Sequence, residues 1–346
     1  MTEPYVSIII PVYNEERLLN RCLESIINQT FTDIEIIIID DASLDNSKKI
    51  IEKIAPSDKR IIFIEHKTNK GQGEARNTGI RESCGRYVFF IDADDYMPHD
   101  GLESLCKIAR EHDDDIIYGK TESRVNVDGM YITHEMRSIT LQEYPPLLYN
   151  HSVWNKLIKR TFILNNCLLF APPRYAEDIA YALKSNLYAD RISITTKVTY
   201  NYHWSRQFEN VTKQKITDAR NNVLSALRLI DEYGCMSLSF EMKKKTACNV
   251  YGSMIRATAV YNRRELHEHL KWWQPILAAM PVTVFNEIPP YQGEFCRLIV
   301  KNRMEEALAL WRNTRLINKM SNFKLTRLFF SLKNYILHFG RRNTAA

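Results

Sequence analysis

The chain has 346 residues, of which 45% are hydrophobic, and this length and composition predict a globular protein that buries a large core. The formal net charge is +6, but the segment from Ser321 to Ala346 holds five Lys or Arg residues and no Asp or Glu, so the positive excess belongs to one end and excludes a nucleic-acid-binding face as its cause. The seven cysteines form no CxxC pair, which argues against a zinc site and against a disulfide framework.

Met1 to Tyr5 leads directly into a β-branched run, with no signal-peptide pattern before it. No apolar stretch approaches the roughly 20 residues that would span a bilayer. We therefore expect a cytoplasmic protein.

Strands and helices alternate over the first part of the chain. Apolar and β-branched runs predict strands at 6–12, 34–39, 60–65 and 87–91. Helical spacing of apolar residues predicts helices at 15–27, around 50–54 and at 74–82. The alternation indicates parallel βαβ units with right-handed crossovers, and therefore an α/β fold with a doubly wound, mostly parallel sheet.

The strand predicted at Tyr87–Ile91 ends abruptly in three carboxylates, Asp92, Asp94 and Asp95. Carboxylates at the carboxyl end of a buried strand point into the crevice where open α/β sheets bind ligands. Their mutual repulsion indicates a shared hard cation, Mg²⁺ or Mn²⁺, with a substrate diphosphate completing the ligand shell. The alternative interpretation is an acidic turn after a strand, because short acidic motifs are common by chance.

Three further side chains lie near the carboxyl ends of predicted strands. Tyr13 could stack on a base, Asp41 could accept a hydrogen bond from a ring N–H, and Arg76 could bind a phosphate. Taken singly, the same residues could be a turn tyrosine, an acidic helix cap and a solvated arginine. Together they predict a nucleotide site with a metal beside its phosphates.

Four segments in order resemble the motifs of the family 2 glycosyltransferases, which are inverting enzymes of the GT-A fold. The segments are Ser7–Glu15, Ile39–Asp45, Gly73–Gly79 and Phe90–Asp95. The resemblance covers about Pro4 to Leu105 and continues weakly to about Thr212. Four motifs in the right order are far more specific than any one of them.

The resemblance implies roles for individual residues. The implied nucleotide contacts are Pro11, Tyr13, Glu15, Asp41, Arg76 and Asp92. Within the family's DxD motif, Asp94 would be the metal ligand, and Asp92 would lie closer to the ribose or sugar. One departure is Ala42, which occupies a turn position often given to glycine, so we expect the nucleotide loop to sit slightly differently.

In the second half of the sheet, a short strand is predicted at Asp115–Tyr118. Val153–Leu157 then resembles a Trp-Asn-Lys-Leu segment of bacterial family members. Trp154 could present an apolar face to a sugar ring, and Lys156 could neutralise a phosphate. A core tryptophan and a surface lysine explain the same residues at least as well.

Glu177 and Asp178 precede a helix predicted at 179–187. Inverting transfer needs a base that removes the proton from the acceptor hydroxyl. Helix capping is the alternative, because the amino end of a helix favours negative charge. With the resemblance to the family's Glu-Asp motif, Asp178 is the predicted base, and Glu177 is expected to orient the acceptor or a neighbouring loop.

An aromatic strand is predicted at Val198–Trp204. Family members often have a basic residue after such a strand, near the donor diphosphate. His203 could fill that role or ligate the metal, and Arg206 could flank the phosphates. A packed strand histidine is the alternative interpretation.

After about Val211, helical periodicity replaces the alternation of strands and helices. Helices are predicted at 223–230, 247–261, 264–273, 294–310 and 324–339. We therefore expect a GT-A domain at 1–210, in which 1–105 binds the nucleotide and 106–210 the acceptor, followed by a helical extension at 211–346. The last helix is basic and amphipathic, so it could lie on the inner face of the cytoplasmic membrane, pack on the preceding helices or form a homodimer.

These features lead us to expect a metal-dependent, inverting glycosyltransferase with Mn²⁺ or Mg²⁺ as its cofactor. It would move a sugar from a UDP-sugar to a hydroxyl of a bacterial surface glycan, free or lipid-linked, such as lipopolysaccharide, capsule or teichoic acid. A nucleotidyltransferase that makes a nucleotide sugar is one alternative, but it would need a glycine-rich basic loop where Val12–Glu16 stands. A binding protein that keeps the pocket without transfer is the other.

Overall fold

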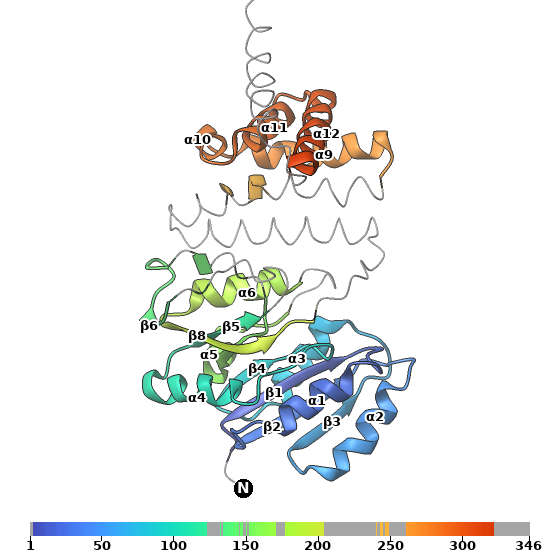
Figure 1. Cartoon of the computed structure of the whole chain (residues 1–346), viewed down its shortest axis with the longest axis vertical. Helices are drawn as coiled ribbons and strands as arrows, with labels where there is room; N and C mark the ends of the chain where they lie inside the picture. Colours follow the sequence, from blue (N-terminus) through green and yellow to red (C-terminus); the bar gives the residue numbers. More distant parts are fainter. Residues whose placement is uncertain are drawn as a thin grey trace, which may run out of the picture. The chain divides into compact units, whose positions relative to one another are not determined.

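The computed structural model describes residues 3–122, 132, 134–144, 146–147, 150, 152–170, 177–203, 240, 243–244, 246–248 and 261–321 (Figure 1). These residues belong to two compact units, of which the first holds residues 3–203 and the second holds residues 240–321. The helices predicted at 223–230 and 324–339, most of the helix predicted at 247–261, and Arg206 lie outside the described residues.

The first unit is built on one eight-stranded sheet, whose strand order is β3-β2-β1-β4-β7-β5-β8-β6. The strands are β1 (Val6–Val12), β2 (Ile34–Asp40), β3 (Ile61–Glu65), β4 (Tyr87–Phe90), β5 (Ile116–Glu122), β6 (Met136–Ile139), β7 (Lys156–Lys159) and β8 (Ile192–Asn201). The four adjacent strands β3, β2, β1 and β4 run parallel to one another, and β5 runs parallel to β8. Strand β7 is antiparallel to β4 and β5, and β6 is antiparallel to β8. The predicted α/β class with a mostly parallel sheet is confirmed.

Helices connect these strands. They are α1 (Leu19–Ile27), α2 (Ser47–Ile54), α3 (Gln72–Glu82), α4 (Gly101–His112), α5 (Arg160–Asn165) and α6 (Glu177–Tyr188), with a 3₁₀ turn at Ala55–Ser57. Strands β1 and β2 are buried at every position, which explains why both read as unbroken apolar runs. Helix α3 approaches β1 so closely that a Cβ on Gly79 would lie 2.3 Å from Ile9 Cγ2, so glycine is needed there.

The first helix begins at Leu19, and the prediction of a start at Glu15 is wrong. Asn14 has a φ of 58°, in the left-handed region that interrupts a helix. The next two backbone N–H groups donate to Ser47 Oγ at 2.8 Å and Asp45 Oδ2 at 3.0 Å. These bonds hold the segment after β1 against the loop after β2, and so delay the start of the helix.

Strand β8 also departs from its prediction, because it runs from Ile192 to Asn201 and not from Val198 to Trp204. Its first residues pair with β5 on one side and with β6 on the other. Ile192, Ser193 and Ile194 are all buried, so polar and apolar residues share the interior. Ile192 to Thr195 alternate between apolar and polar residues, and the pairing with β5 and β6 shows that they belong to the strand.

The second unit contains the helices α9 (Arg263–Ala278), α10 (Val282–Asn286), α11 (Pro290–Val300) and α12 (Met304–Ser321). The prediction of a single helix at 294–310 is wrong, because α11 ends and α12 begins within it. The Arg303 N–H donates to the Leu298 carbonyl at 2.8 Å, and the Asn302 N–H donates to the Ile299 carbonyl at 2.9 Å. With a φ of 60° at Asn302, this is a Schellman ending that uses asparagine in place of glycine.

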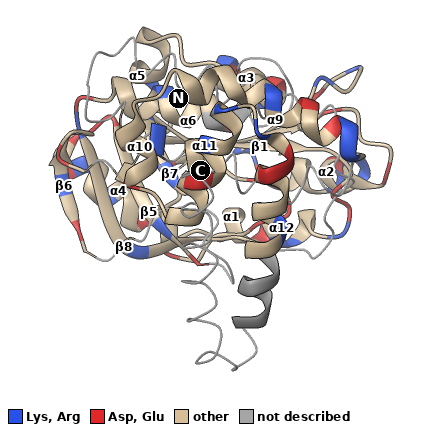
Figure 2. Ribbon diagram, turned by 90° about the horizontal axis from the view of Figure 1, so that it is seen from above, with Lys and Arg blue, Asp and Glu red and all other residues tan. Residues whose placement is uncertain are grey.

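Charged residues of both signs are interspersed along the described ribbon (Figure 2). The basic residues between 324 and 342, which supply most of the net charge, lie outside the described residues. Among the helices that the structure describes, none is long and apolar enough to cross a membrane.

Candidate functional site

The carboxyl ends of the parallel strands β1, β2, β3 and β4 lie at one edge of the sheet. The register pairs Val12 with Asp40 across β1 and β2, and Ile9 with Phe90 across β1 and β4. The loops that leave these strands are therefore neighbours, although they are far apart in the sequence. Between them they carry Tyr13, Asp41, His66 and the turn from Asp92 to Asp95.

The loops after β1 and β2 are joined by hydrogen bonds. The Asn14 N–H donates to Ser43 Oγ at 3.1 Å, and the Leu44 N–H donates to Asn14 Oδ1 at 2.7 Å. Ala42 has a φ of 61°, a left-handed conformation that costs a non-glycine residue roughly 1–2 kcal/mol. The strain explains why glycine suits this position, and the hydrogen bonds to the neighbouring residues offset it.

These joined loops place the predicted base-binding residues at different depths. Tyr13 is 43% exposed, so its ring is available to stack on a ligand. Pro11 is buried within β1, and Glu15 is half-buried with its backbone held by Ser47. Tyr13 is therefore the exposed aromatic surface at this end of β1.

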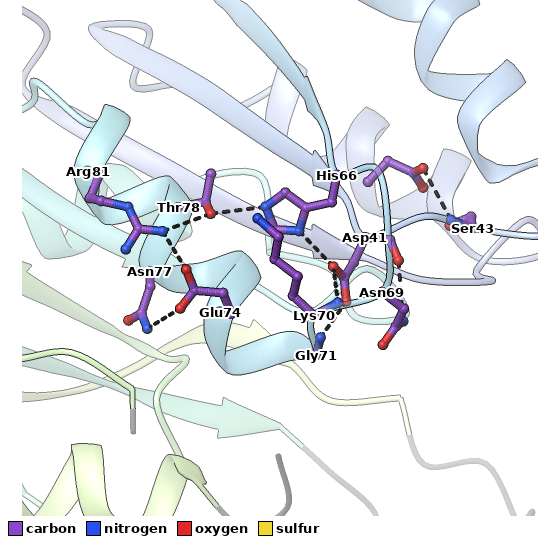
Figure 3. Close-up of polar contacts among 11 residues, drawn as sticks. Asp41, Ser43, His66, Asn69, Lys70, Gly71, Glu74, Asn77, Thr78 and Arg81 are labelled. Atoms are coloured by element: carbon purple, nitrogen blue, oxygen red, sulfur yellow. Dashed lines mark hydrogen bonds and ion pairs between the residues drawn. The ribbon is translucent and has the colours of Figure 1, made fainter. Parts of the chain in front are cut away.

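Asp41 is 2% exposed, and its carboxylate accepts hydrogen bonds from neighbouring residues of the chain (Figure 3). Oδ1 lies 2.7 Å from His66 Nδ1 and accepts the Lys70 N–H at 2.9 Å. Oδ2 accepts the Gly71 N–H at 2.7 Å. Asp41 thus holds the loop that leads into α3, and does not cap the helix that follows its own strand.

The buried Arg76 forms an ion pair with the partly exposed Asp92. Arg76 Nη2 lies 2.6 Å from Asp92 Oδ1, and Gln72 Nε2 donates to the same oxygen at 2.9 Å. Arg76 is 2% exposed, and its guanidinium lies over the ring of Phe170, 5.3 Å from the ring centre. The alternative interpretation of a solvated arginine is wrong. A guanidinium held beside the DxD turn can bind a phosphate there.

Asp95 is fully buried behind the turn and anchors it to β8. Its Oδ2 accepts the Tyr200 hydroxyl at 2.5 Å, and its Oδ1 accepts the His203 N–H at 2.6 Å. The Tyr200 oxygen in turn accepts the Asp92 N–H at 3.2 Å. Burial, and then the charges of Asp92 and Asp94, raise the pKa of Asp95 to about 8. Burial and the charge of Asp95 raise the pKa of Tyr200 well above its usual value, so its hydroxyl stays protonated and can donate.

Replacing Tyr200 with Phe should lower the free energy of unfolding by about 1–3 kcal/mol, because it removes one donor to a buried carboxylate and one acceptor from a buried N–H. The matched control is Tyr202→Phe. Both rings stack on Trp154, but the Tyr202 hydroxyl has no hydrogen-bond partner among the described residues. Urea unfolding of both variants measures the difference, and equal stabilities would contradict this account of Asp95.

Trp154 and Lys156 lie in the interior. Trp154 is 8% exposed, with ring centres 4.7 Å from Tyr200 and 5.5 Å from Tyr202. Lys156 is 1% exposed, and its Nζ lies 3.0 Å from the Tyr118 hydroxyl and 3.1 Å from Asn150 Oδ1. The alternative of a surface lysine is wrong, and burial favours packing roles for both residues over contact with an acceptor.

Asp178 is half-buried in the first turn of α6. Residues three apart share a helix face, so Asp178 lies on the same face as Tyr181. The Tyr181 ring stacks on Phe170 with centres 4.0 Å apart, and Phe170 lies under the Arg76 guanidinium. Aromatic packing therefore links the start of α6 to the Arg76–Asp92 pair. The Glu177 side chain and Arg206 lie outside the described residues, and His203 is half-buried at the end of β8.

The donor set suits a hard divalent cation. Asp92 and Asp94 offer carboxylate oxygens from one turn, and neither is fully buried. Among the residues that the structure describes, no three acidic, His or Cys side chains form a cage for a metal. Magnesium and manganese sites beside phosphates commonly use one or two carboxylates and take further ligands from the substrate. The residues present fit such a cation.

Sequence reasoning missed His66, Gln72 and Tyr200 as parts of this site, and it grouped Asp95 with the carboxylates that share a cation, whereas the structure buries Asp95 behind the turn. The contacts that involve them join segments that lie far apart in the chain, as between Asp95 and Tyr200. The one available signal was the third carboxylate of the acidic turn, since a buried acid needs donors. Nothing in the local pattern around His66 or Tyr200 indicated a partner.

Three comparisons bear on this arrangement. The model of the family described as glycosyl transferase family 2 matches residues 7–167. The chain is 28% identical over 330 residues to the uncharacterized glycosyltransferase EpsJ of Bacillus subtilis, covering 91% of this chain and 94% of EpsJ. It is 30% identical over 239 residues to the poly(ribitol-phosphate) beta-glucosyltransferase of Bacillus spizizenii, covering 65% of this chain but only 37% of that protein.

Among solved structures, that of S. aureus TarS 1–349 in complex with UDP is similar to this chain. The TM-score is 0.73 at 20% identity, and the match covers 90% of this chain and 91% of the TarS chain. The same TarS fragment has also been solved with UDP-GlcNAc. At this identity the likeness establishes a shared fold.

Proposed function

Since the chain carries a glycosyltransferase domain of family 2, we propose that it transfers a sugar from a UDP-sugar to a hydroxyl of a bacterial surface glycan, with inversion at the anomeric carbon and with a divalent metal. The observation that carries this proposal is the Arg76–Asp92 pair at the DxD turn, with 2.6 Å between Arg76 Nη2 and Asp92 Oδ1. A cation and carboxylates held together at the strand ends suit a nucleotide diphosphate and the metal that it brings.

The donor would lie along the carboxyl edge of β1, β2 and β4. Tyr13 would stack on the base, and Asp41 would accept a ring N–H. Asp92 would bind the ribose or sugar, and Arg76 would hold the diphosphate. His203 and Arg206 would lie near the same phosphates. The UDP complex of TarS, which has this fold, supports UDP as the carrier.

The transfer would be a single displacement at the anomeric carbon. Asp178 would accept the proton of the acceptor hydroxyl while the oxygen of that hydroxyl forms the new bond to the anomeric carbon. The bond from the anomeric carbon to the diphosphate oxygen would break, and its electron pair would leave with the UDP. Arg76 would stabilise the growing negative charge on that group. Asp94 would hold Mg²⁺ or Mn²⁺, which when bound supplies further positive charge to the leaving diphosphate.

Glu177 would orient the acceptor beside Asp178. The relatives support a surface glycan, since one acts on poly(ribitol-phosphate) by its name. For a lipid-linked acceptor, the basic segment at 324–346 would contact the inner face of the cytoplasmic membrane, where each nearby Lys or Arg contributes about 1 kcal/mol. We propose residues 1–210 as the catalytic domain and 211–346 as a helical extension.

A panel of nucleotide sugars tests the donor class. With Mn²⁺ present, UDP release from one UDP-sugar should exceed CDP release from the CDP-sugars by at least about tenfold, because Asp41 accepts a ring N–H that cytosine lacks. A coupled assay for free nucleotide, run with and without a glycan acceptor, measures the release. Equal release from all donors, or none from any donor with acceptor present, would contradict the proposal.

A further inference from the structure

A buried imidazole lies beside the Asp41 carboxylate, and the proposed role of Asp41 does not by itself account for it. His66 follows β3 and is 6% exposed. Its Nδ1 lies 2.7 Å from Asp41 Oδ1, and its Nε2 lies 3.0 Å from Thr78 Oγ1 on α3. Figure 3 shows the ring between these two partners. The His66 N–H donates to the Asp40 carbonyl at 2.9 Å, so its backbone is fixed as well.

The two ring nitrogens have different tasks. An ionised carboxylate only accepts hydrogen bonds, so Nδ1 carries a hydrogen and donates it to Asp41. Nε2 then accepts the Thr78 hydroxyl. The Thr78 oxygen also accepts Arg81 Nη2 at 3.1 Å, and Arg81 is paired with Glu74 at 2.6 Å. The imidazole is therefore held from both sides, and cannot turn without breaking one of these bonds.

The same contacts limit what Asp41 can still bind. A carboxylate has about four acceptor positions, two on each oxygen. His66 and Lys70 N–H occupy both positions on Oδ1, and Gly71 N–H occupies one on Oδ2. Among the contacts of the described residues, one position on Oδ2 is left. Because Asp41 is 2% exposed, its partners set the direction of that position, and a ligand cannot draw the carboxylate out.

We propose that His66 is a positioning residue for the donor base: through its Nδ1–H it holds the Asp41 carboxylate so that one acceptor position stays directed to a ring N–H. Thr78 keeps the imidazole in the required orientation. The inference deepens the proposed function and rests on it, since it concerns the base of the nucleotide donor. It assigns base recognition to a residue that itself touches no nucleotide.

Two substitutions separate the two ring nitrogens. The amide nitrogen of Asn lies near the place of Nδ1, so His66→Asn keeps the hydrogen bond to Asp41 and loses the hydrogen bond to Thr78. The amide of Gln lies near the place of Nε2, so His66→Gln keeps the hydrogen bond to Thr78 and loses the hydrogen bond to Asp41. Thr78→Val, which removes the hydroxyl alone, is a second variant should His66→Gln not fold.

Isothermal titration with UDP measures the effect, and ribose 5-diphosphate, which lacks a base, is the control ligand. We expect His66→Gln to weaken UDP binding about tenfold, the loss of one hydrogen bond to a charged group, and His66→Asn to weaken it no more than about twofold. Neither should change the affinity for ribose 5-diphosphate. In steady-state transfer, His66→Gln should raise the donor KM and leave kcat unchanged. Thr78→Val should weaken UDP binding about threefold.

The outcomes separate this inference from the proposed function. If the wild-type protein binds no UDP in the presence of Mn²⁺, the proposed donor is wrong, and the role of His66 with it. If the wild type binds UDP and the His66 and Thr78 variants bind it equally well, only the role of His66 is overturned. If His66→Asn and His66→Gln lose equal affinity for UDP, or if a variant loses as much affinity for ribose 5-diphosphate as for UDP, His66 has a general structural role. Either result would also overturn the role of His66 in base recognition.

Discussion

Replacing Asp178 with Asn should lower the rate of sugar transfer about 100- to 10,000-fold, because the amide cannot take the proton of the acceptor hydroxyl. The side chain keeps its size in the first turn of α6, so the packing of Tyr181 on Phe170 should persist. UDP affinity should therefore stay within about twofold of the wild-type value, since Asp178 acts on the acceptor and not on the donor. Single-turnover transfer and UDP titration measure the two quantities.

The control for this substitution is Asp190→Asn. Asp190 is an exposed aspartate just beyond the other end of α6, where only its backbone N–H is used, in a bond to Asp115 Oδ2. This variant should keep full activity. Full activity in Asp178→Asn, or a loss of UDP binding that matches its loss of turnover, would remove Asp178 from the role of the base.

Removing the divalent cation with EDTA should abolish transfer, and adding Mn²⁺ should restore it. The charge of the leaving diphosphate would otherwise be opposed only by side chains such as Arg76. A metal contributes several kcal/mol to stabilising such charge, so its removal corresponds to a loss of more than about 100-fold. Asp94→Asn should produce a loss of similar size at a fixed Mn²⁺ concentration, with partial recovery as Mn²⁺ is raised.

The matched control for Asp94 is Asp33→Asn, an exposed aspartate just before β2 and therefore at the opposite edge of the sheet. Its Mn²⁺ dependence should equal that of the wild type. Transfer that persists in EDTA, or an Asp94→Asn variant with a wild-type Mn²⁺ dependence, would show that the reaction needs no metal at this turn.

The sequence was enough to predict the nucleotide half of the sheet. Strands β1, β2 and β4 are buried on both faces, so each needs a continuous apolar run, and such a run is visible without knowledge of any partner. The polar residues that end these runs could also be read directly, because parallel strands bring their carboxyl ends to one edge. Tyr13, Asp41 and Asp92 were found in this way.

The parts that depend on contacts between distant segments were predicted poorly. The start of α1 is decided by bonds from the loop after β2, and the first half of β8 by its pairing with β5 and β6. The alternative of a surface Lys156 rested on lysine being rarely buried, yet Tyr118 and Asn150 supply its partners in the interior. Of all these partners, only Asn150, six residues from Lys156, lies close in the sequence.

By itself, the sequence determined the fold class, the positions of the first four strands along the chain and the residues at their carboxyl ends, because these follow from local patterns of burial and polarity. Only the tertiary structure decided which of those residues are held in place and by what. Asp41 is held by His66, and Asp95 by Tyr200, across 25 and 105 residues. A hydrogen bond depends on distance in space and leaves no periodic trace along the chain, so the folded protein alone shows which side chains act together.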